Sequence, residues 1–175
     1  VPLARRIADW IDSDTVPQDG GAETQGALVA NGPIADVREI KAVPGLPNGL
    51  FERIRPLICA LPNPHLSAYN INTLAPIQVP LVTAIFPRGT NSMAVAQALA
   101  ARPARGFADA QSFLAHPALR GVDLSGEASV QLNTRTDWFL LDLNAQLGDA
   151  GQSESVLIDA RTRPVRIVRR ILGTP

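Results

Sequence analysis

The sequence predicts an α+β protein in which a helical domain, residues 1–125, is followed by a small antiparallel sheet over residues 126–175. In the first part, apolar residues recur at the three- and four-residue spacing that is typical of helices. In the second part, apolar and polar residues alternate, which is typical of strands. The chain has 175 residues and is 46% hydrophobic, which is enough to bury one core or two small ones.

The helices of the first domain are expected to be short, because prolines interrupt this part of the chain repeatedly. The chain contains 15 prolines, and a proline inside a helix removes a hydrogen bond and breaks the regular structure. Each helix should therefore span about two to three turns. The predicted helices are residues 2–11, 34–43, 50–61, 78–86, 92–102 and 107–115.

Three or four antiparallel strands are expected after residue 125, separated by turn-forming residues. The segments with alternating character are residues 129–134, 137–147, 155–161 and 164–172. A sheet this small exposes two edges, and the arginine-rich last segment is typical of a guarded edge or of a partner surface. We therefore predict that Arg166 and Arg169 lie near a partner protein, and that the sheet is completed by another chain or by a further part of this protein.

Composition argues against several functions. The 16 basic and 16 acidic side chains give a net charge of zero, so no chain-wide charge attracts nucleic acid or anionic lipid. Cys59 is the single cysteine, which excludes an intrachain disulfide, and its apolar neighbours predict a buried thiol. The two histidines are far apart, and the sequence contains no nucleophile elbow and no phosphate-binding loop. We therefore expect a protein that is not an enzyme.

Residues 8–23, ADWIDSDTVPQDGGAE, contain the strongest candidate for a metal site. Asp12 and Asp14 form a D-x-D step, and a glycine-bearing turn brings Glu23 back toward them. Hard oxygen ligands in such a loop suit calcium, although the spacing is not that of an EF-hand. The alternative is that Asp12 and Asp14 are solvated residues at the end of a helix that only turn the chain.

Residues 34–54 have the layout of a helix-hairpin-helix unit, with a Pro44–Gly45 turn between two apolar segments. Such units can bind DNA when backbone N–H groups face a phosphate and nearby cations neutralise it. Here Pro47 has no N–H to donate, and acidic residues alternate with the nearest basic ones. A nucleic-acid-binding module is therefore the alternative function, and we expect no nucleic-acid partner.

Aromatic and amide side chains receive structural predictions. Trp10 is expected to anchor the first helix in a core, whereas Trp138 stands at the start of a strand and is a candidate for contact with a partner. Asn70 and Asn72, in the segment YNINT, are expected to tie a loop to backbone groups by hydrogen bonds.

Several motifs in order carry a resemblance to a known family. The segments IADWIDSDTVPQDGGAE, VREIKAVPGL, RPLICALP and YNINT together resemble the minor pseudopilin of the type II secretion system called general secretion pathway protein K. The resemblance covers Ala8 to about Phe86, with a sparser continuation to Arg161. The order and spacing of the motifs carry it, rather than any single one.

The resemblance implies a pilin-like fold, in which a long N-terminal membrane helix and a small antiparallel sheet carry a large inserted helical domain. Residues 1–125 would be that insert and residues 126–175 the remaining strands, and the membrane helix and first strand would be absent from this sequence. It also implies a periplasmic protein, anchored in the inner membrane, at the tip of the pseudopilus with the minor pseudopilins I and J. There it would support the export of folded proteins across the outer membrane.

Calcium is also implied by the resemblance, position by position. Asp12 and Asp14 match the D-x-D pair of the family, and residues 21–23 match the first three residues of its GAED segment. Thr24 stands where the family has an aspartate. One carboxylate is thus missing, which implies a weaker site or one ion in place of two.

Overall fold

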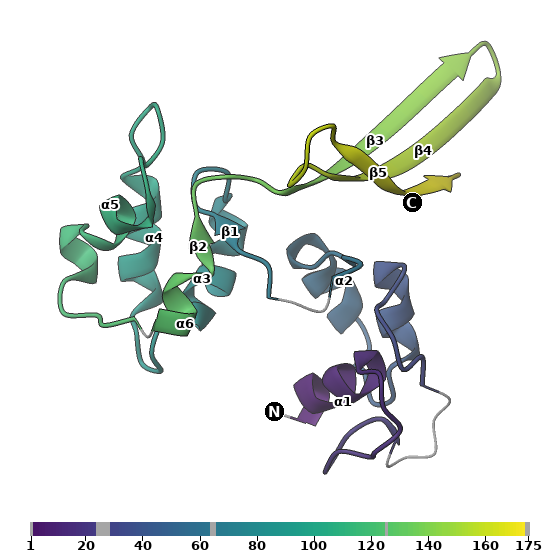
Figure 1. Ribbon diagram of the computed structural model, residues 1–175, viewed down its shortest axis with the longest axis horizontal. Coiled ribbons are helices and arrows are strands. Elements are labelled where there is room, and N and C mark those ends of the chain that lie inside the picture. The colour runs from purple at the N-terminus through teal and green to yellow at the C-terminus, as the bar shows by residue number, and fades with distance from the viewer. Residues whose placement is uncertain (1, 24–28, 64–65, 125, 174–175) are drawn as a thin grey trace. The chain divides into compact units, whose positions relative to one another are not determined.

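The computed structural model describes residues 2–23, 29–63, 66–124 and 126–173 (Figure 1). The chain forms two compact units, Val1–Leu66 and Ser67–Pro175, and each is considered by itself. Both helices and an antiparallel sheet are present, as predicted. The predicted boundary at residue 125 separates an inserted helical domain from the remaining strands of a pilin-like fold. It does not describe compact units, and it stays a prediction. None of the helices in the described ranges has the length and apolar character needed to cross a membrane.

The first unit is helical, and its small core forms around the first helix. Trp10 is only 7% exposed and packs with Ala22 and Val43, as the sequence predicted for this side chain. Partly buried Leu3 and Ile7 of the same helix pack against this cluster. The helices described in this unit are α1 (Pro2–Ile11), the 3₁₀ helix η2 (Val37–Ala42), α2 (Leu50–Ile54) and the 3₁₀ helix η3 (Arg55–Leu57).

The second unit begins with a helical part. Asn91 and Asp109 cap two of its helices, because their side chains accept hydrogen bonds from the first free backbone N–H groups. The elements of this part are β1 (Tyr69–Asn70), the 3₁₀ helix η4 (Pro76–Gln78), α3 (Val79–Ile85), α4 (Ser92–Ala100), α5 (Ala110–Leu114), the 3₁₀ helix η5 (Pro117–Leu119), α6 (Gly126–Ser129) and β2 (Leu132–Asn133).

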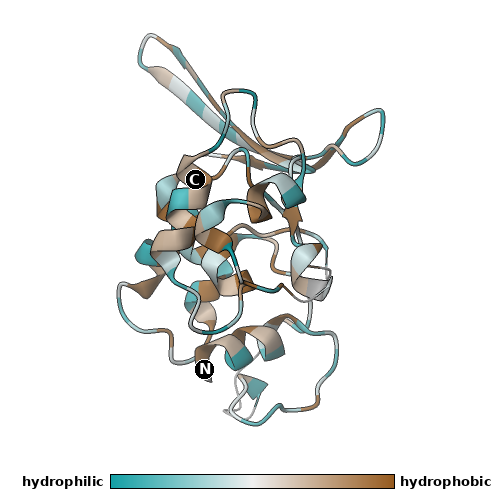
Figure 2. Ribbon diagram, turned by 90° about the vertical axis from the view of Figure 1, so that its left-hand side faces the viewer, coloured by the Kyte–Doolittle hydropathy of each residue, from teal (hydrophilic) through white to brown (hydrophobic). Residues whose placement is uncertain are grey.

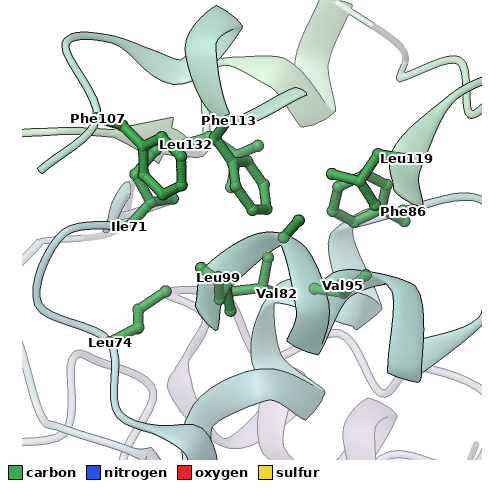
Figure 3. Packing of buried hydrophobic residues seen from close by; sticks show 11 residues of the cluster. Ile71, Leu74, Val82, Phe86, Val95, Leu99, Phe107, Phe113, Leu119 and Leu132 are labelled. Carbon is green, nitrogen blue, oxygen red and sulfur yellow. The ribbon is translucent and has the colours of Figure 1, made fainter. Parts of the chain in front are cut away.

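The core of this helical part is built around aromatic rings (Figure 3). Phe113 is fully buried, and its ring meets those of Phe86 and Phe107 edge to face, at centroid distances of 6.4 and 5.5 Å. Such edge-to-face pairs contribute beyond the burial of their area. Aliphatic side chains from α3, α4 and η5 fill the space around the rings.

Asparagines fasten the loop after β1, as predicted. Asn70 Oδ1 accepts a hydrogen bond from the backbone N–H of Asn72 over 2.9 Å. The Asn72 amide makes two bonds to one distant residue: its Oδ1 accepts from the N–H of Phe107 over 2.7 Å, and its Nδ2 donates to the C=O of Phe107 over 3.0 Å. Arg102 Nη1 also donates to the C=O of Asn72, so Asn72 is held through both its side chain and its backbone.

The sheet of the second unit has three antiparallel strands in the order β3-β4-β5. They are β3 (Trp138–Leu147), β4 (Ala150–Asp159) and β5 (Arg166–Leu172), with a register shift at Leu157/Ile158. Residues 129–134 were a candidate for a fourth antiparallel strand, and this assignment was wrong. Only Leu132 and Asn133 are extended, and they pair in parallel with Tyr69 and Asn70.

Cys59 is exposed, so the predicted burial of its thiol was wrong. The chain after η3 is extended, with φ −128° and ψ 150° at Ile58. Successive side chains of an extended segment point to opposite sides. Ala60 is therefore the buried residue, with 8% of its surface exposed.

Candidate functional site

The acidic segment forms a loop that is fastened to the end of α1 by one buried carboxylate. Asp9 has 0% of its surface exposed. Its Oδ1 accepts a hydrogen bond of 2.9 Å from the backbone N–H of Gln18, and its Oδ2 accepts one of 2.6 Å from the backbone N–H of Glu23. These bonds, that from Glu23 first, lower the pKa of Asp9 below its ordinary value of 3.8. Asp9 is therefore ionised at neutral pH.

Two glycines allow the loop to pass close to this carboxylate. A Cβ atom at Gly21 would lie 2.5 Å from Cγ of Asp9, so a larger residue would displace the carboxylate. Gly20 has a φ of +73°, in the left-handed region that glycine adopts without strain. The N–H of Gly21 donates to the C=O of Gln18 over 2.8 Å and closes the turn. The glycine pair thus shapes the loop against Asp9.

The predicted calcium ligands have different surroundings. Asp12 Oδ2 accepts a hydrogen bond of 2.8 Å from Nε2 of Gln18. The other oxygen of Asp12, Oδ1, and Oε2 of Glu23 are enclosed and have no hydrogen-bond partner. Asp14 is exposed, and its Oδ1 accepts a bond of 2.9 Å from the N–H of Val16, as in a turn at a helix end. Thr24 lies outside the described residues.

Unpartnered carboxylate oxygens that are shut off from water are unfavourable, and a hard cation is one partner that satisfies them. Asp12 and Glu23 thus offer the oxygen chemistry of a calcium site. Within the described ranges, however, no group of three or more histidine, cysteine, aspartate or glutamate side chains is arranged to hold a metal ion.

Sequence reasoning did not identify Asp9. Helical spacing places the apolar stripe of α1 on Leu3, Ile7 and Trp10, and Asp9 lies about 100° away from Trp10 around the helix. No local pattern therefore marks this residue as buried. Its role becomes visible only when the loop returns to it from residues 18 and 23.

The predicted partner residues share one face of the sheet. Trp138 pairs with Asp159 on β4, and Asp159 pairs with Arg166 on β5, so the three side chains stand in one row across the strands. Arg169 pairs with Leu157, two residues along β4, and therefore points to the same side. Arg166 is exposed, whereas Arg169 and Trp138 are half-buried.

An arginine from the β4–β5 connection holds the end of this row. Nε and Nη2 of Arg161 donate to the two carboxylate oxygens of Asp159 over 2.9 and 2.8 Å, and the guanidinium lies 4.6 Å from the centroid of the Trp138 ring. The Arg161 bonds lower the pKa of Asp159 from 3.8 to about 2. Trp138 is thereby fixed in position, on the other side of Asp159 from Arg166.

The sheet also carries many exposed apolar side chains. In the ribbon coloured by hydropathy, both apolar and polar residues occur along its strands (Figure 2). The side chain of Phe139 is 48% exposed and that of Leu143 is 47% exposed. Exposed apolar groups in this number are typical of a surface that contacts another protein. They are Phe139, Leu140, Leu141, Leu143, Leu147, Ile167, Val168 and Leu172.

The helix-hairpin-helix segment does not present cations in the way that phosphate binding requires. A pocket of about 470 Å³ lies along residues 41–52. Lys41 contacts Glu52 over 3.1 Å and lies over the ring of Phe51, and Arg38 is paired with Asp36 over 2.6 Å. Lys41 and Arg38 thus each have an acidic partner, and Arg6, which lies against the hairpin, donates to the C=O of Pro44.

Comparison with known sequences gives one consistent result. Two family models, both described as type II secretion system protein K, match residues 1–63 and 69–135. Type II secretion system protein K of Klebsiella pneumoniae is 31% identical over 178 residues, which cover 98% of this chain and 54% of that protein. The protein of the same name from Pectobacterium carotovorum subsp. carotovorum is 32% identical, with 98% and 54% covered. The chain thus spans about half the length of these relatives.

A solved structure has the same fold. A chain in the crystal structure of the GspK–GspI–GspJ complex from the type 2 secretion system of enterotoxigenic Escherichia coli matches with a TM-score of 0.81 and 28% identity. The match covers 99% of this chain and 63% of that chain. Because it extends over both units, it confirms the predicted α+β fold.

Proposed function

The chain belongs to the type II secretion system protein K family, and we propose that it is part of a structural minor pseudopilin at the tip of the pseudopilus. The observation that carries this proposal is the match over 99% of the chain to a subunit of the GspK–GspI–GspJ complex. The family is a structural component of a secretion machine of the cell envelope. A structural role also fits the sequence, which shows no catalytic constellation.

In the proposed assembly, the chain lies in the periplasm and the full-length protein is anchored in the inner membrane by a helix before Val1. It binds the minor pseudopilins I and J and supports the export of folded proteins across the outer membrane. Its helical domain would leave no room for a further subunit above it, which keeps it at the tip. The family membership and the complex in which the similar structure was solved support this proposal.

We assign the partner surface to the sheet face with Trp138, Arg166 and Arg169. The register of the strands sets these residues on one face, together with Leu140, whose side chain is 59% exposed. Tryptophan and arginine are enriched at the energetic centres of interfaces, because both combine apolar area with a directed polar group. The surface therefore fits a partner that offers acidic and apolar side chains.

Mixing the chain with the periplasmic parts of the two partner pseudopilins is expected to give a stable assembly of the three chains, measured by light scattering after size-exclusion chromatography. The double variant Arg166→Glu, Arg169→Glu should weaken assembly at least tenfold, because a reversed charge faces the same partner groups. The matched control is Arg88→Glu, Arg105→Glu, which makes the same charge change at exposed positions outside the sheet.

If both double variants assemble equally well, the sheet face is not part of the interface. Absence of any assembly would contradict the pseudopilin proposal itself. Salt-sensitive retardation of DNA in a gel, which the neutral net charge and the paired cations of the hairpin argue against, would favour the nucleic-acid-binding alternative.

We further propose that the loop of residues 12–23 binds calcium through Asp12, Asp14 and Glu23. The enclosed and unpartnered oxygens of Asp12 and Glu23 support this assignment. A calcium ion would neutralise the carboxylates and link the end of α1 to the returning loop. It would thereby stabilise the first unit, since a ligand that binds only the folded state adds its binding free energy to folding.

Calorimetric titration is expected to show calcium binding with a dissociation constant on the order of 10–1000 μM. This range includes extracellular calcium modules and extends to the weakest calcium sensors. Calcium at ten times that concentration should raise the free energy of unfolding by about 1.4 kcal/mol. The variant Asp12→Asn should weaken binding, whereas Asp19→Asn, a change at a fully exposed carboxylate of the same loop, should not. No heat of binding together with a Tm that chelator leaves unchanged would show that the site is not a calcium site.

A further inference from the structure

Two oppositely charged residues of the sheet face stand opposite each other but do not pair. Asp159 of β4 is the register partner of Arg166 of β5, and opposite charges in such positions attract each other across the strands. In the part of the chain that the structure describes, however, the Arg166 side chain forms no ion pair and no hydrogen bond. We propose that Arg161 keeps the two apart, so that the Arg166 guanidinium remains available to a carboxylate of the partner protein. This inference rests on the partner surface proposed above.

Arg161 occupies most of the Asp159 carboxylate. Its Nε and its backbone N–H donate to Oδ1 over 2.9 and 3.0 Å, and its Nη2 donates to Oδ2 over 2.8 Å. An ionised carboxylate has about four acceptor sites, so these bonds leave about one. The Asp159 side chain is also only 12% exposed, which restricts the approach of a second guanidinium. Among the groups that lower the pKa of Asp159, Arg161 accordingly comes first and Arg166 last.

The ring of Trp138 holds the same guanidinium at a second point. Arg161 lies over this ring, with 4.6 Å between the guanidinium carbon and the ring centroid, which is the geometry of a cation–π contact. Trp138 belongs to β3 and Asp159 to β4, so Arg161 is bound to two strands at once. To reach Asp159, Arg166 would have to displace a guanidinium that is fastened at both points.

The opposite face of the sheet shows that an arginine of β5 can reach an acid of β4. Arg170 forms an ion pair with Glu154, although its register partner on β4 is Val156. Arg166 stands directly opposite its acid, and directly opposite side chains are closer than diagonal ones. Reach therefore does not explain why Arg166 is unpaired, whereas the occupied carboxylate of Asp159 does.

The test is a double-mutant cycle on assembly with the periplasmic parts of the two partner pseudopilins. Arg161→Ala should raise the dissociation constant of the assembly about tenfold, because Arg166 then pairs with Asp159 in place of the partner. Arg166→Ala should have an effect of similar size, and adding Arg161→Ala to it should change nothing further. Removing the competing carboxylate as well, in Arg161→Ala with Asp159→Asn, should restore most of the affinity. Arg163→Ala, at an exposed arginine of the same connection, is the control and should leave assembly unchanged.

Nuclear magnetic resonance of the chain alone gives a second readout that needs no partner. The Nε–H proton of Arg166 should exchange rapidly with water in the wild-type chain and should be protected in Arg161→Ala. If this proton is already protected in the wild-type chain, the inference is wrong, even where Arg161→Ala does not fold. Additive losses in the cycle, or no recovery with Asp159→Asn, would also contradict it. If the wild-type chain does not assemble with the two partners, the proposed partner surface is wrong, whereas the Arg166 signal still shows whether Arg161 separates the two charges.

Discussion

Replacing Phe113 by alanine is expected to lower the free energy of unfolding of the second unit by about 3–5 kcal/mol. The side chain is fully buried and meets the rings of Phe86 and Phe107 edge to face. Alanine would remove these contacts together with the transfer free energy of the ring, and the helices around it can close the cavity only in part. This loss is a large share of the 5–15 kcal/mol that typically stabilises a domain.

Native-state hydrogen exchange of the amides of α4 in increasing urea measures this loss, because α4 supplies part of the wall around Phe113. The matched control is Phe139→Ala, the same chemical change at a side chain that is 48% exposed. It should change the free energy of unfolding by less than about 1 kcal/mol. Equal losses in the two variants would mean that Phe113 is not at the centre of this core.

Helices with a long apolar stripe could be predicted closely, and short ones could not. The segment expected over residues 2–11 is α1, with the same bounds. The segment expected over residues 34–43 is the six-residue 3₁₀ helix η2. Its start is fixed by Asp36, which forms a capping box with Glu39, and a turn follows at Pro44. These signals limit the segment to six residues, and apolar spacing does not show where it begins and ends.

Long-range pairing accounts for the main difference in the sheet. Strand β3 was expected over residues 137–147 and is found at Trp138–Leu147, because its alternation is local and strong. Leu132 and Asn133 look like part of an antiparallel meander in the sequence. Their actual partners, Tyr69 and Asn70, are more than sixty residues away, and no local pattern reports such a pairing.

The candidate site, too, could be predicted only in part. The types of its expected ligands follow from the sequence, since Asp12 and Glu23 are carboxylates in a glycine-bearing loop. The residue that shapes the loop does not follow from the sequence, because Asp9 acts through backbone groups nine and fourteen residues away. A buried acid that accepts hydrogen bonds only from backbone N–H groups has no matching side chain in the sequence, so its burial cannot be predicted from residue types.

Asn72 is the second residue whose replacement should have a large effect. Its side chain both donates to and accepts from the backbone of Phe107, and this pairs two polar groups that the fold otherwise leaves without a partner. In Asn72→Ala both groups lose their bond. Each unsatisfied buried group costs about 1–3 kcal/mol, so for two groups we expect a loss of about 2–6 kcal/mol in the free energy of unfolding.

Urea denaturation followed by circular dichroism measures this loss, with Gln111→Ala on the exposed side of α5 as the amide-to-alanine control. Gly106 provides a sharper test, because a Cβ there would lie 2.8 Å from the Asn72 side chain, at a φ of +81°. Gly106→Ala should therefore destabilise the wild-type chain by both clash and strain. In the Asn72→Ala background only the strain remains, and the added loss should be smaller. Additive losses would mean that Asn72 and Gly106 do not meet, and that the loop after β1 is held by other contacts.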